Sequence, residues 1–154
     1  MSLVKNYLPF DYWVPAFIRF CEKYSNRDKI YEFLVNLERK IVVDWLVGKT
    51  RIERKIRIYK IIDLIDSSAN PDDVINDEIF NVQDDKNRLK MALDDENFYS
   101  KGHIRVPRYV LLRIDMNLRE NENVIVEYSG HITVKHILSR NPEDRYLLDR
   151  FDES

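Results

Sequence analysis

The chain has 154 residues, of which 44% are hydrophobic, 34% charged and 12% aromatic, and its 25 basic and 27 acidic residues give a net charge of −2. This length suits one domain, or one and a half, and the apolar content is ample for a core, which excludes wholesale disorder. With only 3 glycines and 5 prolines to form turns, an all-β sandwich or barrel is disfavoured and a mainly helical fold is expected.

The cysteine count and the length of the apolar runs narrow the class of protein further. Cys21 is the only cysteine, which excludes an internal disulfide and a cysteine-based zinc cluster. No apolar run approaches the ~18 residues of a membrane span, and no signal peptide is visible. We therefore expect a cytoplasmic protein without a membrane partner.

Both ends of the chain have the features of a fragment of a longer protein. Residues 1–9 are expected to be a flexible start, whose first three residues resemble an expression-tag scar. Residues 150–154 stop in the middle of an amphipathic pattern. We expect a helical domain over residues 10–122 and a second, truncated region over residues 123–154.

Apolar residues at helical spacing predict a first helix over 13–25 and a longer one over 28–47 that ends at Gly48. Thr50 and Glu53 form a capping box for the next helix. The short connection predicts an antiparallel helical hairpin. The residues expected to be buried in it are Ile30, Phe33, Leu34, Leu37, Ile41, Trp45, Ile52, Ile56 and Tyr59.

The second half of the chain continues with helices and then changes period. Pro71 is expected to begin a helix, and further helices are expected over 84–96 and 107–121. The core stripe expected in the last of these is Val110, Leu111, Ile114 and Leu118. From residue 124 the apolar residues alternate, which indicates a β-hairpin that turns at residues 129–130, and Pro142 restarts a helix. The expected fold is mainly α: a bundle of five or six helices with a C-terminal β-hairpin.

Charge is distributed unevenly along the sequence. Residues 39–60 hold eight basic and two acidic side chains, whereas residues 63–96 hold eleven acidic and three basic ones. One interpretation is a helical surface that contacts DNA phosphates, through Arg51, Arg54, Lys55 and Arg57. The other is a solvated helix face that complements the acidic segment.

Catalytic motifs are scarce in this sequence. It contains no glycine-rich phosphate loop, no GxSxG and no HExxH motif. His131 and His136 are five residues apart, so one continuous strand would place them on opposite faces, and we predict no metal site there. On pattern alone, His136 is a half-buried structural histidine.

Three segments nevertheless resemble a known family. They are the C-terminal stretch HITVKHILSRNP at 131–142, the helix PRYVLLRI at 107–114 and the helical pair at 37–59 around the sequence GKTR. Together they resemble the GmrSD-type modification-dependent restriction endonucleases. Members of that family carry a ParB-like nucleotide-hydrolysing domain, a helical region and a C-terminal His-Asn-His (HNH) nuclease domain.

The resemblance implies a role for His136 as the general base that activates water on a phosphodiester beside a divalent metal ion. Two positions depart from the family pattern: Lys135 replaces an acid that is a plausible metal ligand, and Ser139 replaces a proline. An ammonium group cannot bind a cation. The remaining ligands of the family would lie beyond residue 154.

The function implied is that of a fragment of a bacterial DNA-defence protein: a helical linker with a partial HNH-like region, inactive alone and without a cofactor of its own. The full-length protein would use a divalent metal ion, and its partners would be DNA and its own N- and C-terminal domains. The alternative is a non-catalytic helical protein-interaction module with a decayed nuclease motif, in which the basic helix contacts a protein.

Overall fold

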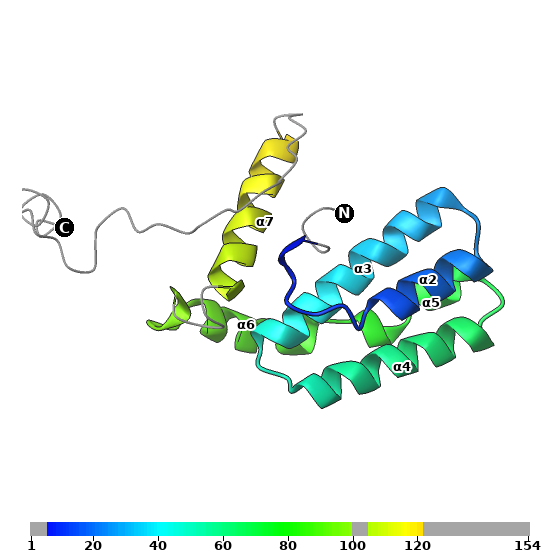
Figure 1. Ribbon diagram of the computed structural model, residues 1–154, viewed down its shortest axis with the longest axis horizontal. Coiled ribbons are helices and arrows are strands. Elements are labelled where there is room, and N and C mark those ends of the chain that lie inside the picture. Colours follow the sequence, from blue (N-terminus) through cyan, green and yellow to red (C-terminus); the bar gives the residue numbers. More distant parts are fainter. Residues whose placement is uncertain (1–5, 100–104, 122–154) are drawn as a thin grey trace, which may run out of the picture.

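The computed structural model describes residues 6–99 and 105–121, and this part of the chain is mainly helical, as the composition predicts (Figure 1). The expected β-hairpin, the helix after Pro142 and all three histidines lie outside the described residues.

The described helices follow the predicted order and differ from the predicted bounds by a few residues at their ends. They are α2 (Val14–Lys23), α3 (Arg27–Leu46), α4 (Arg51–Ser67), α5 (Pro71–Ile75), α6 (Lys86–Leu93) and α7 (Arg105–Asn121), with 3-10 turns at Glu78–Phe80 and Gln83–Asp85 between α5 and α6.

The ends of α3 and α4 are fixed by the capping residues that the sequence offers. Asn26 accepts hydrogen bonds from the first-turn amides of α3, and Gly48 ends that helix region with a φ of 81°. At the start of α4, the Thr50 hydroxyl accepts from the Glu53 amide while the Glu53 carboxylate accepts from the Thr50 amide. The predicted capping box is therefore confirmed.

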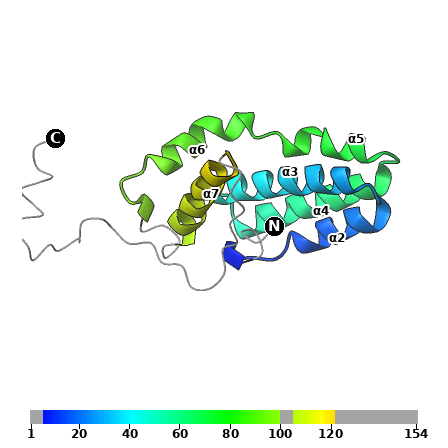
Figure 2. The ribbon, with the colours of Figure 1, turned by 90° about the horizontal axis from the view of Figure 1, so that it is seen from above.

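Helices α3 and α4 run antiparallel and form the predicted helical hairpin (Figure 1). In the perpendicular view, α2 lies on one side of this pair, and α5 and α6 lie along the other side (Figure 2). The core fills the space between these layers. Phe20 of α2 stacks on Phe33 of α3 with ring centroids 4.0 Å apart, and Leu37, Ile61 and Val74 are fully buried nearby.

Helix α4 buries a different face from the one that the sequence analysis expected. Ile52, Ile56 and Tyr59 are 70%, 49% and 65% exposed, so their assignment to the core was wrong. The buried residues of α4 are Ile58, Ile61 and Ile65. This face prevails because it packs against α2 as well as α3, a neighbour that the two-helix argument left out.

The expected core stripe of α7 also needs correction. Leu111, Ile114 and Leu118 are exposed, whereas Val106, Tyr109 and Leu112 are buried. The reason is a specific contact: the Tyr109 hydroxyl donates a 2.6 Å hydrogen bond to Glu38 Oε1, and its ring meets the edge of Trp45. These contacts turn the tyrosine side of α7 toward α3.

Candidate nucleic-acid interface

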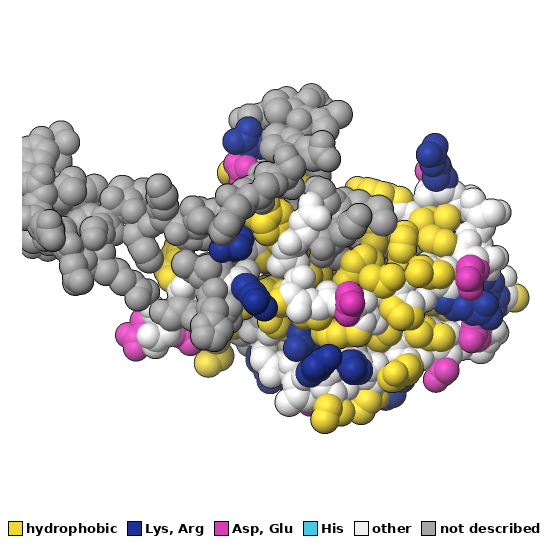
Figure 3. Space-filling model, viewed as in Figure 1, with side chains coloured by type: hydrophobic (Ala, Val, Ile, Leu, Met, Phe, Trp, Pro, Cys, Tyr) yellow, Lys and Arg dark blue, Asp and Glu magenta, His cyan; other side chains and the backbone are white. Residues whose placement is uncertain are grey.

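The first turns of α4 gather basic side chains at one end of the helical hairpin. The space-filling view shows Lys and Arg side chains clustered over this part of the molecule, next to apolar ones (Figure 3). Three of the predicted DNA-binding residues, Arg51, Arg54 and Lys55, line one pocket of about 360 Å³. The other residues of its wall are Pro9, Phe10, Asp11, Tyr12 and Trp45.

Arg54 is held in this pocket by aromatic rings. Its guanidinium carbon lies 4.7 Å from the centroid of Phe10 and 5.6 Å from that of Tyr12, distances at which a cation is attracted to the ring face. Its Nε donates a 3.4 Å hydrogen bond to the Thr50 carbonyl. Among residues 6–99 and 105–121, Arg54 forms no ion pair with a carboxylate, so the aromatic rings and the Thr50 carbonyl position its charge.

Tyr12 keeps its hydroxyl proton across the physiological range. Burial raises the pKa of Tyr12 to about 12, an effect that the positive charge of Arg54 opposes. Its ring stacks on Phe10 with centroids 4.6 Å apart. The phenol is thus a neutral hydrogen-bond donor in the wall of a positively charged pocket.

Arg51 and Lys55 supply the accessible charge of the pocket. Arg51 is exposed and Lys55 partly exposed. Within the residues that the structure describes, neither side chain takes part in an ion pair. Their charges are therefore available to an anion in solution, as the phosphate-binding interpretation requires.

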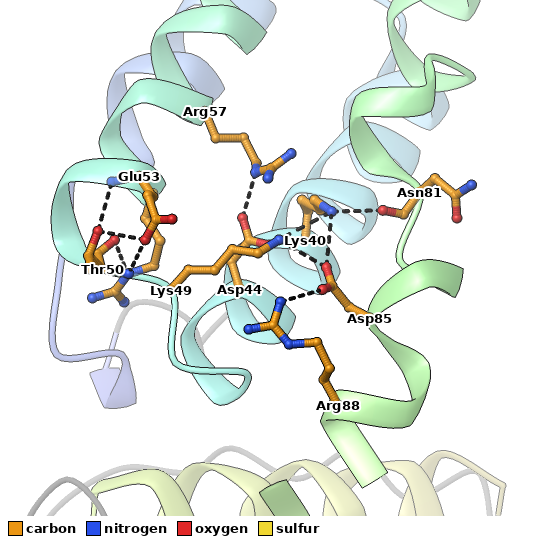
Figure 4. Close-up of polar contacts among 10 residues, drawn as sticks. Lys40, Asp44, Lys49, Thr50, Glu53, Arg57, Asn81, Asp85 and Arg88 are labelled. Carbon is orange, nitrogen blue, oxygen red and sulfur yellow. Dashed lines mark hydrogen bonds and ion pairs between the residues drawn. The ribbon is translucent and has the colours of Figure 1, made fainter. Parts of the chain in front are cut away.

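The structure separates Arg57 from the other three predicted DNA-binding residues. Its Nε lies 2.6 Å from Asp44 Oδ2, although the N–H is not aimed at this oxygen well enough for a hydrogen bond. Asp44 is only 1% exposed and is itself part of a buried ion cluster (Figure 4). The buried carboxylate of Asp44 therefore neutralises the positive charge of Arg57.

The ion cluster joins α3, α4 and the segment before α6. Lys49 Nζ donates hydrogen bonds of 2.9 Å to both Asp44 Oδ1 and Asp85 Oδ2. Lys40 Nζ donates to the Asn81 carbonyl at 2.7 Å and lies 3.7 Å from Asp44 Oδ1. Lys40 and Lys49 belong to the basic region of residues 39–60 and Asp85 to the acidic segment of residues 63–96, so the two segments meet at this buried cluster.

The electrostatics of the cluster follow from burial and pairing. Burial lowers the pKa of Lys40, since the charged form loses water. Burial is also the largest single effect on Lys49 and on Asp85, and it opposes the charge of each. The hydrogen bonds and opposite charges around them together outweigh burial, so the pKa of Lys49 is raised and that of Asp85 lowered. The cluster is a structural element that fixes the connection between α3 and α4.

Sequence reasoning missed Phe10 and Tyr12 as parts of the site. Their segment, just before α2, carries no basic residue and no periodic pattern that relates it to α4. The single available signal was the concentration of aromatic residues at 7–13, because aromatic side chains and arginine commonly stack.

The nuclease part of the expectation falls on residues outside the described ranges, since His136 and Lys135 are both there. In the described ranges, no three His, Cys, Asp or Glu side chains are placed to hold a metal ion together. None of the described helices has the length and apolar content needed to cross a membrane.

Comparisons of this chain with protein-family models, with curated proteins and with solved structures find no match.

Proposed function

We propose that this chain is a nucleic-acid-binding helical module of a cytoplasmic, GmrSD-like DNA-defence protein, and that α4 contacts the phosphate backbone through Arg51, Arg54 and Lys55. The observation that carries the proposal is the convergence of these three cations on one pocket. Arg57 is left out of the interface because Asp44 neutralises it.

The wider proposal includes the nuclease features that the family resemblance implies, which fall on residues outside the described ranges. The bundle would carry a C-terminal β-hairpin with His136 as the general base, and the full-length protein would supply the divalent metal ion and the remaining domains. The support for these parts is the sequence of residues 131–142 alone.

The backbone-binding proposal predicts weak, sequence-independent and salt-dependent binding of DNA. We expect Arg51→Glu combined with Lys55→Glu to weaken binding at least about tenfold at low salt, and to reduce the slope of log affinity against log salt by about 0.9 for each lost phosphate contact. Fluorescence anisotropy with labelled single-stranded and double-stranded oligonucleotides measures both quantities.

A matched control is available on α6. Lys86 and Lys90 are exposed and, like Arg51 and Lys55, four residues apart, so Lys86→Glu with Lys90→Glu makes the same charge change elsewhere. Equal loss of affinity in both double variants would show an effect of net charge alone and would refute the α4 surface.

The alternative, a protein-interaction module, is favoured by a different observation. Ile52, Ile56 and Tyr59 form an exposed apolar stripe on the outer face of α4, and Arg51, Lys55 and Lys60 lie beside it in the sequence. An acidic amphipathic helix has the chemistry that complements such a stripe.

A peptide of residues 142–154 has this chemistry, with five acidic side chains and four large apolar ones. If the stripe is the functional surface, NMR titration with this peptide will shift the Ile52 and Ile56 methyl signals, and Ile56→Ser will abolish the shift of the Ile52 signal. If the methyl signals stay unchanged while DNA binds, the backbone-contacting function is favoured.

A further inference from the structure

The pocket at the start of α4 has the dimensions and the chemistry of a small-ligand site. Its volume of about 360 Å³ falls within the ~300–1,000 Å³ that small-molecule sites occupy. Three cationic side chains line it together with one carboxylate, that of Asp11, so the wall carries an excess of positive charge. The rings of Phe10, Tyr12 and Trp45 share the wall. This composition selects a ligand that is an anion at one end and flat and apolar at the other.

Two polar atoms of this wall have unmet hydrogen-bonding capacity. Tyr12 Oη and Arg54 Nη1 are buried and make no hydrogen bond with any described residue. Burying a donor without a partner costs free energy that a hydrogen bond would recover. Both side chains are partly exposed and line the pocket, so a bound ligand gives each donor a partner once the side chain turns toward it.

The charge and shape of the pocket distinguish between kinds of phosphate. A phosphodiester inside a strand carries a single charge and has a sugar on both sides, so it contacts exposed cations of the pocket, such as Arg51, without entering the pocket. A phosphomonoester has a single attachment and carries a charge of about −1.5 to −2 at neutral pH. A concave pocket with an excess of cations therefore fits the monoester better.

We propose that this pocket binds a phosphomonoester that carries an aromatic base, either the terminal nucleotide of a strand with a 5′-phosphate or a free mononucleotide. Arg54 and Tyr12 donate hydrogen bonds to the phosphate oxygens, Arg51 and Lys55 balance the charge, and the base lies against the aromatic wall. The inference rests on the proposed function, because it gives the same basic surface a specific ligand.

Calorimetric titration of the full chain with AMP, adenosine and inorganic phosphate tests the ligand class. We expect AMP to bind at least about tenfold more tightly than adenosine, because only AMP brings the charge that the pocket cations attract. Inorganic phosphate should bind more weakly than AMP, because it lacks the base. Equal affinity for AMP and adenosine, or no binding of AMP, would overturn the proposal.

The Tyr12→Phe variant tests the hydrogen bond while it keeps the ring in place. We expect this variant to bind AMP about tenfold more weakly, because losing one hydrogen bond to a charged group changes affinity by about that factor. Tyr31→Phe is the matched control, since Tyr31 is 69% exposed on α3, and it should leave AMP affinity unchanged. Circular dichroism verifies that both variants fold. Unchanged AMP affinity in a folded Tyr12→Phe variant would refute the assigned contact.

Oligonucleotides with and without a 5′-phosphate separate this inference from the function it rests on. If the pocket takes a strand end, the 5′-phosphate will strengthen binding and Tyr12→Phe will remove the gain. If AMP binds but the 5′-phosphate has no effect on strands, the ligand is a free mononucleotide. If strands bind through Arg51 and Lys55 regardless of end group while AMP does not bind, the pocket inference fails and backbone binding stands.

Discussion

Arg54 and Arg57 are three residues apart on α4, yet their guanidinium groups have opposite roles. Arg57 lies against the buried carboxylate of Asp44, whereas Arg54 lies over the ring of Phe10 and keeps its charge. An ion pair removes a cation from the reach of an outside anion, but a ring face does not. Counting basic residues in a sequence cannot make this distinction, because it depends on which neighbours the fold brings in.

Asp85 gives the ion cluster a pH dependence. The pKa of Asp85 in the folded protein lies below its usual value of 3.8. Burial alone would raise it, but the hydrogen bond from Lys49 and the positive charges of Lys49, Lys40 and Arg88 together outweigh burial. A carboxyl whose pKa is depressed by folding stabilises the protein above the unfolded-state pKa, and this contribution is lost as the pH falls through the folded-state pKa. We expect the free energy of unfolding to decrease as the pH falls below about 4.

The Asp85→Asn variant isolates this contribution. At neutral pH we expect it to cost about 1–3 kcal/mol, because Lys49 loses a buried partner, and below pH 4 its stability should depend less steeply on pH than that of the wild type. Asp84→Asn is the control, since Asp84 is the exposed neighbour. Urea titrations over a range of pH measure both effects, and parallel curves for wild type and Asp85→Asn would contradict the assignment.

At the scale of the helix, α4 presents apolar residues on two sides, and only one side is buried. Ile61 is fully buried, whereas Ile56 is 49% exposed. We expect Ile61→Ala to cost about 2–5 kcal/mol through the cavity it leaves. Ile56→Ala should change stability by no more than about 0.5 kcal/mol, as is usual at a surface position.

Chemical denaturation of the two alanine variants gives the comparison directly, because they remove the same atoms from the same helix. A cost for Ile56→Ala equal to that for Ile61→Ala would mean that the outer stripe is covered in solution. It would thereby support the protein-interaction alternative.

The helices themselves could be predicted from sequence because their signals are local. The Thr50–Glu53 capping box and the glycine at position 48 act within a few residues of the helix ends that they fix. The buried faces of α4 and α7 could not be predicted in the same way. Each helix has two apolar stripes, and the choice depends on α2 and on the contact between Tyr109 and Glu38.

The candidate site was predictable only in part for the same reason. Arg51, Arg54 and Lys55 are close in sequence, so one helix end brings them together. Phe10 and Tyr12 are about forty residues away from them and reach the pocket only because α2 packs along α4. The link between Lys49 and Asp85 spans a similar separation.

For the whole chain, the remaining question is whether it carries nuclease chemistry of its own. We expect the 154-residue chain to leave plasmid DNA intact in Mg²⁺ or Mn²⁺ and to hold neither ion at micromolar concentration. An HNH site needs a base, several protein ligands on the metal and a group that polarises the base. Of these, the resemblance supplies His136, while Lys135 stands where the family has an acid.

The chemistry of the remaining groups supports that expectation. A lone imidazole holds Mg²⁺ poorly, because this ion prefers oxygen ligands in an octahedral set. Calorimetric titration with Mg²⁺, Mn²⁺ and Zn²⁺, beside a plasmid cleavage assay, measures both properties. Cleavage that disappears in His136→Ala, or a stoichiometric micromolar site that depends on His136, would show that the chain completes its metal site with residues outside the described ranges.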